Sequence, residues 1–312
     1  MNIRHEEVSY PSSNGVNTIV GSIWQPDGTL RGIVQITHGM TEHVERYDWF
    51  ARQLCAAGFL VCGDDHLGHG RSAPTRDDLG YFSEKNGDQY LIQDEHLLRQ
   101  LMQKRYPELP YFLLGHSMGS FITRGYITQY GAGLSGYICC GTSGKNPLNR
   151  LAILAADLMV ALRGGHRRGN LLNKLAFQDY NSRYTGEVIT GNNWLSRDFA
   201  NYPDYSQDPK GNFTFTNAGF RDLFRLLYNV TGTKWSNRIP KGLPILFASG
   251  DMDPVGQYGE GVKEVYELVK AAGVRDVTLK LYPQARHELH NELNKDEFVA
   301  DVVAWIEKHL PS

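Results

Sequence analysis

The chain has 312 residues, which is enough for one large domain carrying an insertion or for two modest domains. Its 41% hydrophobic and 21% charged residues and its formal net charge of -2 are typical of ordinary soluble globular proteins, and no charge excess indicates nucleic acid as a partner. The N-terminal segment carries acids where a secretory signal needs an apolar core, and no run of about 18 apolar residues is present, so we expect a cytoplasmic location.

The first part of the chain predicts a β-hairpin followed by alternating parallel strands and helices. Two expected strands, 7–12 and 17–25, are joined by a Ser-Asn-Gly turn. The continuous apolar run at 32–37 is typical of a strand buried on both faces of a parallel sheet. The elements expected next are a helix at 47–57, a strand at 59–63, a helix at 90–105, a strand at 111–114, a helix around 121–126 and a strand at 135–140.

The alternation stops near residue 147 and resumes near residue 243. The intervening stretch has helical pieces and irregular polar segments without a clear buried strand, which indicates an inserted, mainly helical cap. The elements expected after it are a strand at 243–248, a helix at 260–272, a strand at 277–282 and a helix at 295–309. We therefore predict an α/β fold with a mostly parallel, doubly wound sheet, a core of residues 1–146 and 238–312, and a cap of residues 147–237.

The most informative motif is G-H-S-M-G at 115–119, which follows an apolar strand and precedes a helical segment. A strand, a G-x-S-x-G turn and a helix in this order place a serine on a sharp turn with its hydroxyl exposed. The glycines serve this turn because a Cβ at either flank would meet neighbouring backbone. The pattern predicts Ser117 as a nucleophile, although G-x-S-x-G also arises by chance in plain glycine-rich turns.

Acyl transfer by a serine also needs N–H groups that stabilise the negative charge of the tetrahedral intermediate. The N–H of Met118 opens the expected helix and has no partner within it, so it is the first candidate. The second is expected in the loop after strand 32–37, where the sequence His38-Gly39-Met40 assigns the N–H of Met40. Each such donor is worth about 3 kcal/mol in the transition state.

A serine hydroxyl further requires a histidine base that is oriented by a carboxylate. The loops after strands 243–248 and 277–282 supply both, because parallel strands bring their carboxyl ends to one edge of the sheet. We choose Asp253 over Asp251, which comes earlier in its loop and is placed to cap the turn. We choose His287 over His290, which falls in the following segment. The resulting chain order is Ser117, Asp253, His287.

No metal or cofactor is expected. The histidines His38, His43, His66 and His69 lie in separate loops without the spacing of a zinc site, and the phosphate-binding pattern G-x-x-x-x-G-K is absent around 68–70. The four cysteines lie in apolar runs without basic neighbours, so we expect buried, unreactive thiols at Cys55, Cys62, Cys139 and Cys140.

Four segments give the chain a specific resemblance to a known family: HGMTEHVERY at 38–47, DDHLGHGRS at 64–72, GHSMGS at 115–120 and ARHELHNE at 285–292. Together they resemble the monoacylglycerol lipase and lysophospholipase branch of the α/β-hydrolases, which is also grouped with serine aminopeptidase-like hydrolases. The resemblance implies the α/β-hydrolase fold, the triad Ser117, Asp253 and His287, oxyanion donors at Met40 and Met118, and a small lipid ester as substrate. One departure is Ser120, where many relatives have glycine.

The cap is expected to set substrate choice. Its segment 148–162 has more apolar residues than one helix face needs for packing on the core: Leu151, Ile153, Leu154, Leu158, Met159, Val160 and Leu162. The surplus, with Leu151, Leu154 and Leu158 as the named substrate-binding candidates, is expected to line an acyl-chain tunnel or to touch a membrane surface. Helix packing alone is the alternative.

Two other functions fit the same motifs. A peptidase or amidase that releases N-terminal residues would need a cap carboxylate for the substrate's ammonium group, and the sequence offers Asp157, Asp179, Glu187, Asp198, Asp204 and Asp208. A small-molecule receptor without turnover is the second alternative, since the fold alone does not dictate chemistry. Acyl-chain length, headgroup preference and oligomeric state are not indicated by the sequence.

Overall fold

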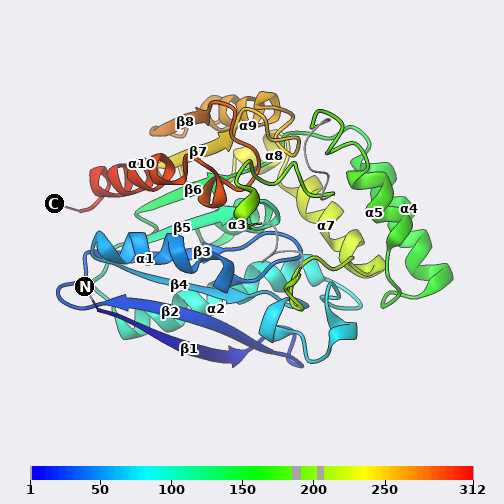
Figure 1. Cartoon of the computed structure of the whole chain (residues 1–312), viewed down its shortest axis with the longest axis horizontal. Helices are drawn as coiled ribbons and strands as arrows, with labels where there is room; N and C mark the ends of the chain where they lie inside the picture. The colour runs from blue at the N-terminus through cyan, green and yellow to red at the C-terminus, as the bar shows by residue number, and fades with distance from the viewer. Residues whose placement is uncertain (1, 185–190, 202–206, 312) are drawn as a thin grey trace.

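A computed structural model describes residues 2–184, 191–201 and 207–311 (Figure 1). Its eight strands form one sheet in the order β1-β2-β4-β3-β5-β6-β7-β8. The strands are β1 Ile3–Pro11, β2 Thr18–Pro26, β3 Gly32–Thr37, β4 Phe59–Asp65, β5 Tyr111–His116, β6 Gly136–Cys140, β7 Ile245–Gly250 and β8 Val277–Tyr282. The pairs β1–β2 and β2–β4 are antiparallel, and all other pairs are parallel.

Helices cover both faces of the sheet (Figure 1). The α-helices are α1 Asp48–Ala56, α2 Gly87–Arg105, α3 Met118–Tyr130, α4 Asn149–Arg163, α5 Asn170–Phe177, α7 Asn217–Asn229, α8 Thr233–Ser236, α9 Glu260–Ala271 and α10 Lys295–Lys308. Short 3-10 helices are η1 Val44–Tyr47, η2 Gly70–Ser72, η3 Arg76–Asp78, η4 Phe199–Asn201 and η5 Leu289–Asn291. Buried side chains of α1 and α10 join one hydrophobic cluster, and those of α2, α3 and α9 join the other.

The central strands show why a doubly wound sheet forms. Every residue of β3 is buried, and its side chains alternate between the two clusters: Ile33 packs with the α2 and α3 side, and Val34 and Ile36 pack with the α1 and α10 side. The sequence prediction of an α/β-hydrolase architecture is therefore confirmed.

Most predicted elements agree with the structure within a few residues. Helix α2 begins one turn earlier than expected, at Gly87 instead of Tyr90. Packing at this end of the helix requires glycine, because a Cβ at Gly87 would lie 2.2 Å from the carboxylate of Asp222 in α7. This contact reaches across 135 positions and leaves no local signal in the sequence.

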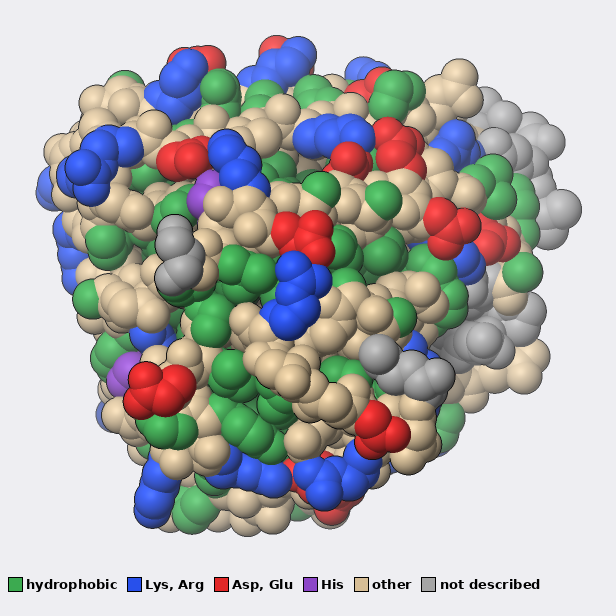
Figure 2. All heavy atoms as spheres, turned by 90° about the vertical axis from the view of Figure 1, so that its left-hand side faces the viewer, with side chains coloured by type: hydrophobic (Ala, Val, Ile, Leu, Met, Phe, Trp, Pro, Cys, Tyr) green, Lys and Arg blue, Asp and Glu red, His purple; other side chains and the backbone are tan. Residues whose placement is uncertain are grey.

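Between β6 and β7, the described residues form helices and loops, with one isolated bridge between Arg168 and Thr216. Helices α4, α5 and α7 lie together on the right in Figure 1, away from the edge that carries both termini. That other side of the molecule has interspersed acidic and basic side chains around hydrophobic ones (Figure 2). No helix in the described part of the chain is long and apolar enough to cross a membrane.

Candidate active site

Ser117 lies on the turn between β5 and α3 in a strained conformation, with φ 55° and ψ -122°. Such a backbone persists only where the surroundings hold it, and the glycines on either side make this possible. A Cβ at Gly119 would lie 2.1 Å from the carbonyl oxygen of Thr37, and a Cβ at Gly115 would lie 2.1 Å from Oγ1 of Thr123. Ser117 is half-buried, while its neighbours on both sides are buried.

His287 and Asp253 meet at the carboxyl ends of β8 and β7. The Nδ1 atom of His287 lies 2.9 Å from Oδ2 of Asp253, and both side chains are buried. The N–H of Val255 donates to Oδ1 of Asp253 at 2.8 Å, which fixes the carboxylate. Because a carboxylate only accepts, Nδ1 of His287 donates, and in the neutral ring Nε2 is left as an acceptor.

The alternatives that the sequence offered have other roles. Asp251 was expected to cap the turn of its own loop; in the structure it accepts the N–H of Gln284, in the loop after β8, at 2.6 Å. His290 stacks on Tyr47 with ring centroids 4.2 Å apart. Burial and the charge of His116 lower the pKa of His290 to about 3, so this ring is neutral. The structure thus brings together Asp253 and His287, and not Asp251 or His290.

The His287 ring lies beside the turn that carries Ser117. Its centroid is 4.7 Å from that of His116, the residue before Ser117. Gly141, which follows β6, allows this approach, because a Cβ there would lie 3.2 Å from atoms of both rings. On its other side the His287 ring lies 5.0 Å from the indole of Trp194, in the segment between β6 and β7.

The loop after β3 approaches Ser117 closely. A Cβ at Gly39 would lie 3.0 Å from Cβ of Ser117 and 2.6 Å from Oε1 of Glu42, so only glycine fits here. The Gly39 N–H donates to Oε1 of Glu42 at 2.5 Å, which fixes the start of the loop. Within the described residues, the N–H groups of Met40 and Met118 have no hydrogen-bond acceptor. Both are therefore available to a ligand.

A buried network of polar side chains contacts the backbone at the start of this loop. The sequence analysis did not predict it. Nε2 of His66 donates to the carbonyl of His38 at 3.0 Å, and the two rings stack with centroids 3.8 Å apart. Burial opposes the charge of His66, but the hydrogen bond to Asp64 and the charge of Glu95 raise its pKa to about 9. Burial and the charge of Asp64 raise the pKa of Glu95 to about 8. The signal in the sequence was the Asp-Asp-His run at 64–66.

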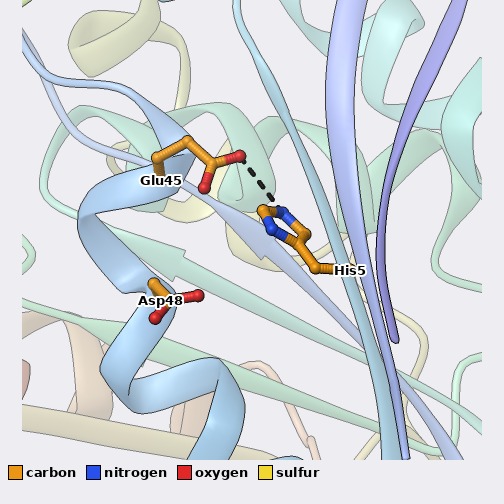
Figure 3. A group of neighbouring side chains, drawn as sticks. All are labelled: His5, Glu45 and Asp48. Carbon is orange, nitrogen blue, oxygen red and sulfur yellow. Dashed lines mark ion pairs between the residues drawn. The ribbon is translucent and has the colours of Figure 1, made fainter. Parts of the chain in front are cut away.

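Asp64, His66 and Glu95 are side chains of the types that bind metal ions, and a second such group lies near the edge strand β1. It consists of His5 of β1, Glu45 of η1 and Asp48 of α1 (Figure 3). Nε2 of His5 is 3.3 Å from Oε1 of Glu45. Asp48 accepts from Nε1 of Trp24 at 2.8 Å and from Nε of Arg52 at 2.7 Å. These carboxylates are engaged by protein donors, so the geometry gives no reason to place an ion there.

The segment between β6 and β7 is fastened to both loops of the site. The N–H groups of His287 and Glu288 donate to the carbonyls of Trp194 and Leu195 at 3.3 and 2.7 Å. At the other loop, the N–H of Asn212 donates to the carbonyl of Thr41 at 2.9 Å. His43 pairs with Asp208 with Nε2 and Oδ2 2.5 Å apart.

Aromatic side chains extend from His287 into this segment. Ring centroids are 5.0 Å apart between His287 and Trp194, and 5.1 Å apart between Trp194 and Tyr180. The contacts continue to Phe177 of α5 at 5.2 Å and from there to Phe220 of α7 at 6.4 Å. An apolar wall therefore leads from the candidate base into the helices between β6 and β7.

The leucines named as substrate-binding candidates do not belong to this wall. Leu151, Leu154 and Leu158 are 63, 64 and 57% exposed on α4, so they do not line an enclosed tunnel in this structure, and their role in substrate binding stays a prediction. The physical reason is the rotation of the helix, which buries Asn149 and Ala156 and points the leucines outward. Lipid-surface contact is the part of the expectation that this placement leaves open.

Comparisons with known proteins identify the family of the chain. The family model described as "Serine aminopeptidase, S33" matches residues 28–294. The chain is 30% identical to a monoacylglycerol lipase of Mycolicibacterium smegmatis over 97% of this chain and 98% of that relative. It is 29% identical to the human monoglyceride lipase over 86% of this chain and 80% of that relative.

Among solved structures, a highly thermostable carboxyl esterase from Bacillus coagulans in complex with glycerol has a TM-score of 0.92. It is 35% identical, and the alignment covers 99% of this chain and 100% of the esterase. The family match spans most of the chain, and the structural match spans nearly all of it. The chain belongs to the serine aminopeptidase, S33, family and has the α/β-hydrolase fold.

Proposed function

We propose that Ser117 is the nucleophile of a lipid ester hydrolase whose substrate is a monoacylglycerol or a closely related ester with one acyl chain. Carboxylic ester hydrolysis is the activity common to the lipases and esterases that match this chain, and it is the activity of this chain. The observation that carries the proposal is the buried Asp253–His287 pair beside the strained turn at Ser117.

The proposed reaction has two halves. In the first, Nε2 of His287 takes the hydroxyl proton as Oγ of Ser117 bonds to the ester carbon, and then gives it to the leaving alcohol. In the second, a water molecule gives a proton to the same nitrogen and bonds to the acyl carbon; the bond between that carbon and Oγ of Ser117 then breaks, Oγ takes the proton back from Nε2, and the fatty acid leaves. Asp253 keeps Nδ1 of His287 protonated throughout, so that Nε2 stays free to accept.

The negative charge on the ester oxygen is assigned to the N–H groups of Met40 and Met118. They lie on the two segments that meet at Ser117, and no protein acceptor engages them in the described part of the chain. Donors fixed in advance are most effective at this point, since they need no reorganisation when the charge develops. No step calls for a group outside the chain.

The apolar wall favours a substrate with a long acyl chain. Trp194, Tyr180, Phe177 and Phe220 form successive ring contacts that start at His287. Phe220 is buried in the core, so the part of the wall that an acyl chain could contact is its half-buried end at Trp194 and Tyr180, next to His287. The monoacylglycerol lipases among the relatives support the same assignment.

A peptidase or amidase is less well supported, because three of the four candidate cap carboxylates that the structure describes have partners. Asp157 pairs with Arg225 at 2.9 Å, Asp208 pairs with His43 at 2.5 Å, and Asp198 lies 3.8 Å from Lys295. Asp179 is exposed. Two of the carboxylates considered from the sequence, Glu187 and Asp204, lie outside the described residues.

We assign the outer face of α4 and α5 to contact with an anionic phospholipid surface, which would supply the substrate. Seven leucines on it are 52 to 72% exposed: Leu148, Leu151, Leu154, Leu158, Leu162, Leu171 and Leu175. Residues 145–178 include six Lys and Arg and one acid, although the chain as a whole has a net charge of -2. Apolar side chains surrounded by cations suit an anionic bilayer.

An ester panel tests the catalytic proposal. Monoacylglycerols of increasing chain length, short p-nitrophenyl esters and aminoacyl anilides are compared for wild type and Ser117→Ala. We expect long-chain monoacylglycerols to give the highest kcat/KM, anilides to be poor substrates, and Ser117→Ala to lose at least about 10⁴-fold in kcat. An alanine variant that keeps most of its activity would refute the proposal.

Vesicle sedimentation tests the membrane proposal. Wild type should bind vesicles of phosphatidylglycerol and phosphatidylcholine more tightly than vesicles of phosphatidylcholine alone. The double variant Leu154→Ser and Leu158→Ser should bind the anionic vesicles at least about tenfold more weakly, since it loses two apolar side chains that binding would bury in the bilayer. Val16→Ser is the matched control, because Val16 is 86% exposed on the β1–β2 turn. Equal binding by all three proteins would contradict the assignment.

A further inference from the structure

A set of buried charges joins the two loops that flank Ser117. Arg46 donates from Nη1 and Nη2 to the two carboxylate oxygens of Glu288, at 2.9 Å each. It also donates from Nη1 to Oε2 of Glu42 at 2.6 Å. Glu42 in turn accepts the N–H of Gly39. Arg46 therefore connects the loop beside the nucleophile with the loop that holds the candidate base.

His116 contacts both loops at once, and its hydrogen bonds fix its charge. Nε2 lies 3.1 Å from the carbonyl oxygen of His287, which only accepts, so Nε2 carries a hydrogen. The hydroxyl of Tyr47 lies 2.9 Å from Oε1 of Glu42 and gives its single hydrogen to that carboxylate. The Tyr47 oxygen, 2.8 Å from Nδ1 of His116, can then only accept. Both ring nitrogens carry hydrogens, so the ring is an imidazolium.

The surrounding charges stabilise this imidazolium. Burial alone would lower the pKa of His116, but the hydrogen bond and the charge of Glu42 raise it above its ordinary value. Burial also opposes ionisation of Glu42, yet His116 and Arg46 hold the pKa of Glu42 well below its usual range. The charge of Arg46 outweighs burial at Glu288 and lowers its pKa to about 2. The partly buried Arg46 and the buried His116 thus face two buried anions, Glu42 and Glu288.

The other titratable groups that face His116 are neutral or belong to the base itself. His290, with its ring centroid 5.0 Å away, is kept neutral by burial and by the charge of His116. Burial raises the pKa of the Tyr47 hydroxyl and of the Cys140 thiol, which lies beside His116 on β6. His287 is the remaining neighbour, with ring centroids 4.7 Å apart.

We propose that His116 is a positioning residue with a permanent positive charge. It sets the distance between the loop after β8, which carries His287, and the oxyanion loop after β3, which carries Met40. The inference rests on the function proposed above for Ser117 and His287. One hydrogen of the imidazolium holds the backbone of His287, and the other is linked through Tyr47 to Glu42. A fixed charge this close also acts on the reacting centre, which a change of charge at residue 116 would reveal.

The charge is tested directly on the wild-type protein by NMR with ¹⁵N-labelled histidine. We expect both ring nitrogens of His116 to report bound hydrogens at pH 8, with the signal assigned by its loss in His116→Gln. A neutral His116 at pH 8 would overturn the proposal. This measurement does not depend on turnover, so it stands even if Ser117→Ala retains activity and the proposed function falls.

The positioning role is tested by pH profiles of kcat/KM. His116→Gln keeps a donor toward His287 and removes the charge, so the acidic limb should move up by about one pH unit. We expect kcat to fall about tenfold or more while KM stays within about twofold. The double variant His116→Gln and Glu42→Gln also lacks the negative charge of Glu42. The acidic limb of its kcat/KM profile should therefore move back toward the wild-type position.

The control variant is His96→Gln, because His96 on α2 bonds to Tyr126 at 3.0 Å, away from this network. It should leave the profile unchanged. A limb that stays in place in His116→Gln, with activity lowered only through a lower melting temperature, would overturn the positioning role.

Discussion

His287 contacts Asp253 through Nδ1 and Oδ2 at 2.9 Å, although 34 residues separate them in the chain. The contact is set by the sheet, because β7 and β8 are parallel neighbours in register from Ile245–Val277 to Gly250–Tyr282. The loops that follow these strands must therefore meet at the same edge. The carboxylate that orients the base is thereby fixed by strand pairing and not by local sequence.

Asp253→Asn tests the orientation of the base. The amide keeps the size of the side chain but offers a donor to Nδ1, which favours the wrong tautomer of His287. We expect kcat for a short ester to fall by about 10³- to 10⁴-fold with little change in KM, as measured by steady-state kinetics. The matched control is Asp251→Asn, which should keep most of the activity and cost about 1 kcal/mol of unfolding free energy through the weakened turn cap.

Gly39→Ala tests the approach of the oxyanion loop to the nucleophile. Its new methyl group would lie 2.6 Å from Oε1 of Glu42 and 3.0 Å from Cβ of Ser117, so the loop must move outward. A displaced donor loses transition-state stabilisation, and we expect kcat to fall by about 10²-fold or more. Gly165→Ala is the control, because its methyl group would make one similarly tight contact, 3.3 Å to Cβ of Ala218, but in the segment between α4 and α5 and not at Ser117. Equal kinetics for the two variants would contradict this placement of the loop.

Ser120 takes the place of a glycine common in the family that the sequence resembles, and the structure gives it a packing role. Its hydroxyl donates to the carbonyl of Ser117 at 2.6 Å and lies 2.8 Å from Oγ1 of Thr142. Ser120→Ala should lower the free energy of unfolding by about 1 kcal/mol in urea denaturation. Esterase kcat should stay within about twofold, and a loss of 100-fold would show that the hydroxyl acts in the chemistry.

The buried network beneath His38 predicts a loss of stability on the alkaline side. The pKa of Glu95 is raised from 4.5 to about 8, and that of His66 from 6.5 to about 9. Between pH 4.5 and about 8 for Glu95, and between pH 6.5 and about 9 for His66, the folded state holds a proton that the unfolded chain releases. The free energy of unfolding therefore falls as pH rises through these ranges. The slope is at most about 1.4 kcal/mol per pH unit for each proton.

Glu95→Gln should remove the part of the pH dependence of the unfolding free energy that the Glu95 carboxyl causes. Urea denaturation at pH 6 and pH 8 should show a smaller difference in unfolding free energy for the variant than for wild type. Glu267→Gln on α9 is the control, since that side chain is 67% exposed, and its difference should match that of wild type. A wild-type slope retained in Glu95→Gln would show that the carboxyl is ionised in the folded protein.

The sequence predicted the core well because its signals were local. Apolar strands ended in Gly-rich or acidic loops, and parallel pairing alone was enough to expect Asp253 and His287 at one edge. The choice of Asp253 over Asp251 rested on reach along the loop, and the structure shows Asp251 engaged with Gln284. The roles of Ser117, Met40 and Met118 in catalysis remain predictions.

The cap and the buried networks were beyond the sequence for physical reasons. The apolar count of 148–162 could not tell which helix face turns outward, because that depends on packing against α7. Glu42 and Arg46 are four residues apart, but His116 and Glu288 lie far from them in the chain, and the ion pairs among these segments follow from the three-dimensional approach of two loops. The apolar wall likewise joins α5 and α7 through a contact between distant residues, which no periodic pattern in the sequence predicts.

The central claim is that Ser117 is activated for attack, and covalent labelling measures this most directly. The folded protein is treated with a fluorophosphonate and digested, and the modified peptide is identified by mass spectrometry. The account predicts one adduct, on Ser117, that is absent from Ser117→Ala and strongly slowed in Asp253→Asn. Failure of the folded wild type to react, or an adduct on another residue that persists in Ser117→Ala, would contradict it.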